Sequence, residues 1–341
     1  MFAKNKSLIG LDIGSAVVKA VEVGVSGDKI VVTGYGTFPV TAGAVEDSVR
    51  GALKAGKIDC RRVATAISGR KVVVRYFPVQ GGLDHKAIRD VVEKESSNYI
   101  PFDLNQVEKD FFPVPTKDAA GAESTKVVLV AAKSEEIEDR YKILRNCGLI
   151  PIVIDIDTFA IGNAFELWTV NTNHSVGDQV TGLVDIGASK TTINIIQGTV
   201  SNFSREVYIG SNDMRNAISK KLGQSEAESE KLLLNFGDHY DSVKEGITPV
   251  LEDIGNEIRL SIDFYENQFE TEVREIFVSG GILRFPGILE ILGQIFYLPT
   301  QGWDPLAGVE LASGVDATQL RTESCQLAVA VGLASRALKR T

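Results

Sequence analysis

The sequence predicts an α/β fold built from two related halves, and two observations carry this prediction. An apolar, strand-like segment ending in Asp-Ile-Gly occurs twice, first as Leu8-Ile-Gly-Leu-Asp12-Ile-Gly14-Ser15 and again as Thr181-Gly-Leu-Val-Asp185-Ile-Gly187-Ala188. Each copy is followed by further strand signals and then by helical segments, so the copies head two stretches of similar design. The length of 341 residues also suits two domains of ordinary size.

Composition restricts the class of protein. Hydrophobic residues make up 44% and charged residues 24%, which is the balance of a folded globular chain with an ample core. Lysine and arginine total 36 against 45 aspartate and glutamate, a formal net charge of −9. A nonspecific nucleic-acid binder needs a basic excess, so this balance predicts no nucleic-acid partner.

The cysteines and the apolar segments indicate the cellular compartment in which the protein works. Cys60, Cys147 and Cys325 are widely spaced, without a Cys-x-x-Cys pair, which predicts free thiols in a reducing compartment. Residues 1–6 contain no apolar signal core. The most apolar stretch, Ile276–Leu298, is interrupted by charged residues and a proline, so we expect no direct membrane insertion. The sequence therefore predicts a cytoplasmic protein.

Strand signals open the first half, and a small block interrupts it. Apolar patterns predict strands over residues 8–13, 17–23, 29–37, 63–68 and 72–77, with a helix near 45–55. Pro78 and Gly81-Gly82 then break the pattern, and Asp84 is a good N-cap for a helix to about Ser97. Strands near 107–114 and 126–132 and a charged helix over 134–146 follow, before an apolar run over 150–156. We interpret residues 79–150 as an inserted α+β subdomain with its own sheet.

The second half begins near residue 181. Strand signals lie over residues 182–186, 191–196, 200–208 and 274–279, with helical segments over 211–236 and 248–269 and an alanine-rich helix over 322–339. We assign residues 181–321 to the second half, with a helical subdomain over about 209–272. Residues 1–78, 151–180 and 322–341 are assigned to the first half.

The paired Asp-Ile-Gly segments carry the chemistry. A phosphate needs close backbone approach and N–H donors, which a glycine permits because it has no Cβ. An aspartate at each strand end can hold a hydrated magnesium ion. Two such turns facing each other would grip a triphosphate from both sides, and their small residues keep the turns open. The candidate residues are Asp12, Gly14, Ser15, Asp185, Gly187, Ala188 and Ser189. The alternative is a pair of ordinary tight hairpins.

A third element fits the same site. Ser279-Gly280-Gly281 ends a strand and precedes a helical segment, and such a turn lets an adenine ring or ribose lie against bare backbone. Glu257 and Ser261 share one face of the long helix and could reach the same ribose. The alternatives are a plain strand-to-helix turn and a solvated helix face.

These residues, in this order, resemble the actin, Hsp70 and sugar-kinase superfamily, and more closely its bacterial branch containing FtsA and PilM. Gly10-Leu-Asp12-Ile-Gly14-Ser15 with Lys19, the stretch 155–165 and the segment Glu257–Tyr265 are similar to that branch. The tract from Glu93 through Tyr99-Ile100-Pro101-Phe102, with residues 107–111, is very similar to the one that marks PilM-type type IV pilus assembly proteins.

The resemblance implies an actin-like (ribonuclease H-like) duplicated fold of four subdomains with a small SHS2-like insertion. It implies ATP and Mg²⁺ as ligands, with Asp12, Gly14, Ser15 and Lys19 serving the first phosphate loop. Asp185, Gly187, Ala188 and Ser189 would serve the second loop, and Gly280 with Gly281 the adenosine. Whether Lys19 touches phosphate or simply lies on its strand stays open. One departure is Gly210-Ser211, where many relatives have Gly-Gly.

The resemblance also implies partners. PilM-type proteins capture the short N-terminal cytoplasmic tail of the inner-membrane protein PilN in a groove between the insertion and the first half, and work with other pilus components as scaffolds or rings. Tyr99, Ile100 and Phe102 are the candidate partner-binding residues, with an exposed strand edge such as 72–77 for strand addition. The alternative is that the aromatic pair packs in the insertion's own core.

Whether the protein is an enzyme depends on a group that activates water. Asp12 and Asp185 are equally explained by magnesium, and Asp157 and Asn163 are further candidates. No acceptor pocket with a dedicated base is evident, so we expect ATP to set the geometry of the cleft, with slow turnover at most. The alternatives are an active actin-like ATPase and an FtsA-like division protein. The latter would normally end in a membrane helix, whereas only Arg340-Thr341 follow the last predicted helix.

Overall fold

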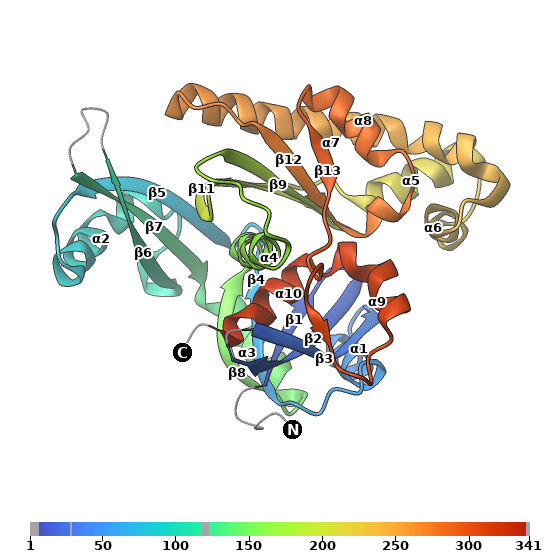
Figure 1. The fold of residues 1–341 in the computed structure, drawn as a ribbon, viewed down its shortest axis with the longest axis horizontal. Coiled ribbons are helices and arrows are strands. Elements are labelled where there is room, and N and C mark those ends of the chain that lie inside the picture. The colour runs from blue at the N-terminus through green and yellow to red at the C-terminus, as the bar shows by residue number, and fades with distance from the viewer. Residues whose placement is uncertain (1–6, 28, 118–122, 339–341) are drawn as a thin grey trace. The chain divides into compact units, whose positions relative to one another are not determined.

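The computed structural model describes residues 7–27, 29–117 and 123–338, and it divides into two compact units (Figure 1). The smaller unit is Ile67–Arg145, and the larger comprises Met1–Ala66 with Asn146–Thr341. The larger unit contains two sheets and the smaller unit one.

The first sheet of the larger unit has the strand order β14-β3-β2-β1-β4-β8. Strands β1, β2 and β3 form an antiparallel meander, and β4 lies parallel to β1. The bounds are β1 Leu8–Ile13, β2 Val17–Ser26, β3 Lys29–Pro39, α1 Val45–Ala55, β4 Arg62–Ile67, β8 Ile150–Ile156 and β14 Glu310–Leu311.

The second sheet repeats this arrangement, with the order β11-β10-β9-β12-β13. Strands β9, β10 and β11 form the antiparallel meander, and β12 lies parallel to β9, as β4 does to β1. The bounds are β9 Val180–Ile186, β10 Thr191–Gln197, β11 Val200–Val207, β12 Glu275–Ser279 and β13 Thr300–Gly302. The duplication expected from the two Asp-Ile-Gly segments is therefore present in the strand topology.

Two helices with small residues fill the space between these sheets. Helix α4 (Asp157–Thr172) packs against the second sheet, and α10 (Ala328–Ala334) packs against β1. The two helices touch closely, since a Cβ built on Gly332 would lie 1.7 Å from the carbonyl oxygen of Ala160. Phe165 of α4 contacts Phe277 of β12, with ring centroids 4.9 Å apart. The larger unit is thus held together through a shared core.

Helices α5 (Ser211–Leu222), α6 (Glu226–Leu234), α7 (Tyr240–Phe269) and α8 (Ile288–Phe296) complete the second half. Figure 1 shows α7 and α8 on one face of the second sheet, with α4 on the other. Helix α7 begins earlier than predicted and passes through Pro249, and its apolar face is buried from Val243 to Tyr265. Among the described residues, none of the helices combines the length and apolar character needed to cross a bilayer.

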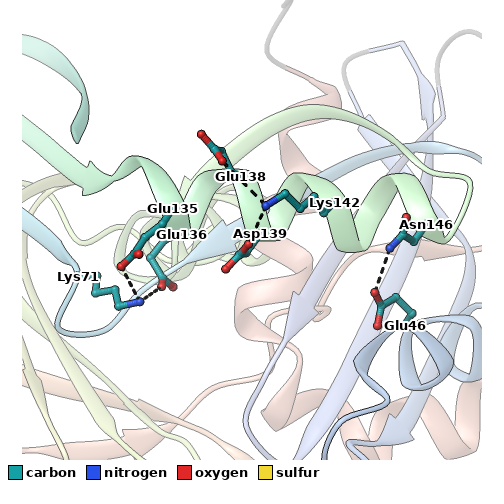
Figure 2. Close-up of polar contacts among 8 residues, drawn as sticks. All are labelled: Glu46, Lys71, Glu135, Glu136, Glu138, Asp139, Lys142 and Asn146. Carbon is teal, nitrogen blue, oxygen red and sulfur yellow. Dashed lines mark hydrogen bonds and ion pairs between the residues drawn. The ribbon is translucent and has the colours of Figure 1, made fainter. Parts of the chain in front are cut away.

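The smaller unit is a sheet of order β5-β7-β6 with helices α2 and α3. Its elements are β5 Val72–Gln80, α2 His85–Tyr99, β6 Val107–Lys117, β7 Glu123–Lys133 and α3 Ser134–Asn146. The predicted cap is confirmed, because the Asp84 carboxylate accepts the Ala87 N–H at 2.7 Å. Figure 2 shows Lys71 lying between Glu135 and Glu136 in the first turn of α3, at 2.9 and 2.6 Å. In the larger unit, Asn146 donates to Glu46.

The expected boundaries differ from the structure in three places. Strand β5 belongs to the smaller unit, because its residues 72–80 pair with β7, whereas we expected the insertion to begin at 79. The chain is back in the first sheet at β14, before the expected return at 322. The helix expected over 322–339 is not continuous, because α9 (Ala317–Glu323) ends at its start, a 3-10 turn follows, and α10 covers only Ala328–Ala334. A strand's apolar pattern shows that one face is buried, but not which sheet it joins.

Short 3-10 helices connect several elements. They are Leu104–Gln106, Gly237–His239, Gly281–Arg284, Ser324–Gln326 and Ser335–Ala337.

Candidate nucleotide-binding site

The first Asp-Ile-Gly segment forms a hairpin whose two strands each contribute a charge. Asp12 on β1 lies directly opposite Lys19 on β2, and cross-strand neighbours on one face of a sheet are within contact distance. Lys19 Nζ is 2.7 Å from Asp12 Oδ2, and the side chains are only 17% and 12% exposed. Lys19 therefore lies on its strand and points at the loop aspartate.

The second segment forms the matching hairpin, and Asp185 ends it in the same way. Its neighbour on the parallel strand β12 is Ser279, whose hydroxyl donates to Asp185 Oδ1 at 2.6 Å. Burial raises the pKa of the Asp185 carboxyl above its ordinary value, while the Ser279 hydrogen bond and the charge of Lys19 act in the opposite direction. A carboxylate in this position is stabilised by any further positive charge.

The two hairpins meet at these residues. Burial alone would lower the pKa of Lys19, but Asp12, and more weakly Asp185 and Asp157, raise it above its ordinary value. One ammonium group thus interacts with a carboxylate from each Asp-Ile-Gly segment and with Asp157, the first residue of α4. Asp12 and Asp185, far apart in the sequence, lie in one cluster.

A second lysine completes the cluster, and sequence reasoning missed it. Lys190 follows the second loop directly, and its Nζ lies 3.0 Å from Asp157 Oδ2 and 2.5 Å from Glu206 Oε1. Glu206 lies on β11, and its other carboxylate oxygen accepts the Tyr208 hydroxyl at 3.1 Å. Lys190 could have been identified from the sequence because it directly follows Ser189, a predicted loop residue. Glu206 carried no such signal.

The backbone of the second loop is oriented by the start of α5. The carbonyl oxygens of Gly187 and Ala188 accept the N–H groups of Ser211 and Asn212 at 3.0 and 2.9 Å. Because N–H and C=O of one trans peptide unit point in opposite directions, the N–H groups of Ala188 and Ser189 point away from α5. Gly210 makes this contact possible, since a Cβ there would lie 2.6 Å from both carbonyl oxygens. Ser211 in place of a second glycine is compatible with the contact.

The Gly280-Gly281 turn packs against the same hairpin. Gly280 has φ +118°, and a Cβ on it would lie 2.2 Å from the Ile186 carbonyl oxygen, so only glycine suits the position. Its N–H donates to the carbonyl of Cys325 at 2.7 Å. By contrast, Glu257 forms an ion pair with Arg205 of β11 at 2.9 Å and is partly exposed.

The candidate partner residues lie at the end of α2 in the smaller unit. Ile100 is 4% exposed and belongs to that unit's own core. The Tyr99 ring stacks on Phe77 with centroids 4.3 Å apart. Phe102 is partly exposed, and the Lys133 ammonium lies 5.5 Å from its ring centroid. Tyr99 and Phe102 both pack against that core and are only partly buried, so the accessible part of each ring lies at the surface of the unit.

The charges of this cluster decide whether it could accept a divalent cation together with an anion. Four carboxylates surround two ammonium groups, an excess of negative charge that a divalent cation would neutralise. Among the described residues, no group of three or more histidine, cysteine, aspartate or glutamate side chains is arranged to hold a metal ion alone. Magnesium commonly keeps several waters and takes one or two protein carboxylates with phosphate oxygens, so the residues present fit it.

Two sheets share the same core, an antiparallel meander with a parallel fourth strand, and each begins with an Asp-Ile-Gly hairpin that brings its aspartate to a common cluster. This arrangement defines an actin-like α/β protein. The protein-family model described as "Type IV pilus assembly protein PilM" matches residues 10–338 of this chain. The chain therefore belongs to the PilM family of type IV pilus assembly proteins.

Solved structures agree with this fold. A chain of the PilM–PilN type IV pilus biogenesis complex is similar over 98% of this chain and 99% of its own, with a TM-score of 0.84 and 24% identity. The ethanolamine utilization protein EutJ from Carboxydothermus hydrogenoformans matches over 96% of this chain and 89% of its own, with a TM-score of 0.59 and 13% identity. A diol dehydratase-reactivating factor matches over 98% of this chain and its own entire length, with a TM-score of 0.54 and 8% identity.

Proposed function

We propose that the protein binds ATP with magnesium between its two Asp-Ile-Gly hairpins and serves as a cytoplasmic scaffold of type IV pilus assembly. The observation that carries the nucleotide proposal is the interaction of Lys19 with both Asp12 and Asp185, one from each half of the larger unit. Membership of the PilM family supports the pilus role. An active actin-like ATPase is the alternative.

In this proposal each part of the site has a role that its geometry supports. Asp12 and Asp185 hold the hydrated magnesium ion, which neutralises phosphate charge when bound. The N–H groups of Ala188 and Ser189, which point away from α5, face the phosphates, and Gly14 and Ser15 form the corresponding turn of the other hairpin. Gly280 and Gly281 accept the adenosine. ATP then holds the two halves in one geometry, and its hydrolysis is slow.

Calorimetric titration of ATP into the purified protein with magnesium tests this function. We expect binding in the micromolar range or tighter, a free energy of about −8 kcal/mol. Hydrolysis, measured as phosphate release, should stay well below the roughly 10 per second of a typical enzyme. Absence of binding by any adenine nucleotide would refute the site, and turnover at ordinary enzyme rates without partners would favour the ATPase alternative.

The partner that we propose is the N-terminal cytoplasmic tail of a PilN-like inner-membrane protein, which would keep the protein near the membrane and assemble it with other pilus components. The similar solved chain is part of a PilM–PilN complex. Within the smaller unit, β5 and β6 are the edge strands. Strand β6 contains Pro113 and Pro115, which cannot donate backbone hydrogen bonds. The proline-free part of β5, residues 72–77, is the better edge for an added strand.

Substituting Phe102 separates a binding role from a core role. We expect Phe102→Ser to weaken binding of a synthetic peptide of the PilN-like tail by about tenfold, 1.4 kcal/mol, because a partly exposed aromatic anchor is lost. Thermal stability and ATP binding should change little. Phe112→Ser is the matched control, since Phe112 is a 68% exposed phenylalanine on β6. Equal loss of peptide binding in both variants, or unfolding of the Phe102 variant, would contradict the assignment.

A further inference from the structure

Lys190 occupies a position that the nucleotide proposal leaves without a role. It closes the turn of the second hairpin, and its ammonium joins Asp157 at the start of α4 to Glu206 on β11. The three side chains are between 17% and 19% exposed, so this is a sheltered ion pair network rather than a solvated surface pair. Burial would lower the pKa of Lys190, but the two carboxylates raise it, so the group stays charged.

The sheet register aligns four residues across the second sheet, and the ion pair with Glu206 holds Lys190 at one end of this row. Ser279 lies opposite Asp185, Asp185 opposite Thr192, and Thr192 opposite Glu206, on four successive strands. Adjacent strands are about 4.8 Å apart, so β12 and β10 are about 10 Å apart along this row. If adenosine lies at Gly280, at the end of β12, and phosphate lies at Asp185 on β9, a lengthening phosphate chain extends toward β10 and Lys190.

The negative charge of a terminal phosphate would also change the ion pairs of Lys190. ATP carries one phosphoryl group more than ADP, and its added negative charge would approach the carboxylates of Glu206 and Asp157. Lys190 forms ion pairs with both of those carboxylates. Turning the ammonium from Glu206 to the phosphate would relieve the repulsion and form a charge-assisted hydrogen bond.

We propose that Lys190 recognises the terminal phosphate of ATP by exchanging its ion pair with Glu206 for one with the phosphate. Lys190 is then the residue that determines specificity for ATP over ADP. The bridge that Lys190 makes between Asp157 of α4 and Glu206 of β11 is then present without ATP and broken when ATP binds. This inference rests on the proposed nucleotide function, and it adds to it a nucleotide-dependent contact within the larger unit.

Two substitutions with opposite expected effects test it by calorimetry with MgATP and MgADP. Lys190→Met should weaken ATP binding by about tenfold or more, the magnitude of a charge-assisted hydrogen bond, and ADP binding by less than about twofold. Glu206→Gln frees Lys190 from one competitor, so ATP affinity should be unchanged or rise, with ADP affinity constant. Lys231→Met, on the exposed face of α6, is the matched loss of a lysine and should change neither.

Each outcome separates this inference from the proposed function. If the unmodified protein binds neither nucleotide, the proposed function fails. If it binds both and Lys190→Met weakens them equally, Lys190 only supports the fold and the inference is overturned while the function stands. Parallel losses of ATP affinity in Lys190→Met and Glu206→Gln would also overturn it. Melting temperatures of the nucleotide-free variants show whether either substitution acts through stability.

Discussion

Gly332→Ala is expected to destabilise the protein by about 3 kcal/mol or more, because the added methyl group has no space. A Cβ at this position would lie 1.7 Å from the Ala160 carbonyl oxygen, so α10 and α4 would have to separate. Both helices lie in the core between the two sheets, and α10 also packs on β1. Thermal or chemical unfolding would measure the loss, and we expect MgATP binding to weaken with it.

A matched control shows that the loss is steric. Alanine is a better helix former than glycine by about 1 kcal/mol, so helix propensity alone would stabilise the variant. Gly246 is also a buried helical glycine, but the nearest heavy atom to its Cβ position is 3.6 Å away. Gly246→Ala should therefore be neutral or stabilising. If both variants unfold at the same temperature as the unmodified protein, the close packing of α4 on α10 is not as the structure describes.

Asp185→Asn is expected to weaken magnesium-dependent ATP binding by about a hundredfold, while leaving the nucleotide-free protein at least as stable as before. The carboxylate is buried and surrounded by Asp12 and Asp157, which raises its pKa, so its charge is unfavourable until a cation arrives. The amide keeps the shape but binds magnesium poorly, and loss of about two charge-assisted contacts corresponds to that hundredfold. A residue that serves binding at a cost in stability is expected to lose ligand affinity, but not folding stability, when its charge is removed.

The measurement is a pair of titrations, with magnesium and with a chelator, together with a melting temperature. Without metal, removing a charge that repels phosphate should leave ATP affinity unchanged or raise it, and Asp12→Asn should show the same metal dependence. Asp263→Asn makes the same charge change on the exposed face of α7 and serves as the control. A nucleotide-free Asp185→Asn protein that melts well below the unmodified one would show that Asp185 stabilises the fold instead of binding metal.

Several features of the site follow from short stretches of sequence. Asp12 and Asp185 stand out because an apolar strand ending in Asp-Ile-Gly occurs twice, and a repeated strand–turn–strand unit places its last polar residue at the same edge of each sheet. The turn at Gly280 is similarly local, since positive φ selects glycine. The Asp84 cap follows from the same kind of short-range chemistry.

Other features depended on contacts between distant segments. Lys190 could be suspected from its place beside the loop, but its pairing with Asp157 and Glu206 brings together α4, the β9–β10 turn and β11. Gly210 supports the second loop only because α5 begins against it. Strand β5 joins β7 rather than the first sheet, although its residues alternate as they would in either.

The sequence by itself thus determined the α/β class, the duplication, the two aspartate hairpins and the glycine turn, because strand alternation, turn chemistry and helix caps act over a few residues. Only the tertiary structure decided that Lys19 interacts with both aspartates, that Lys190 bridges two elements, that Ile100 is buried in its own unit, and that the C-terminal helix breaks before packing on β1. These depend on the sheet register and on how closely helices approach, which are set by contacts across the whole chain and by no local pattern.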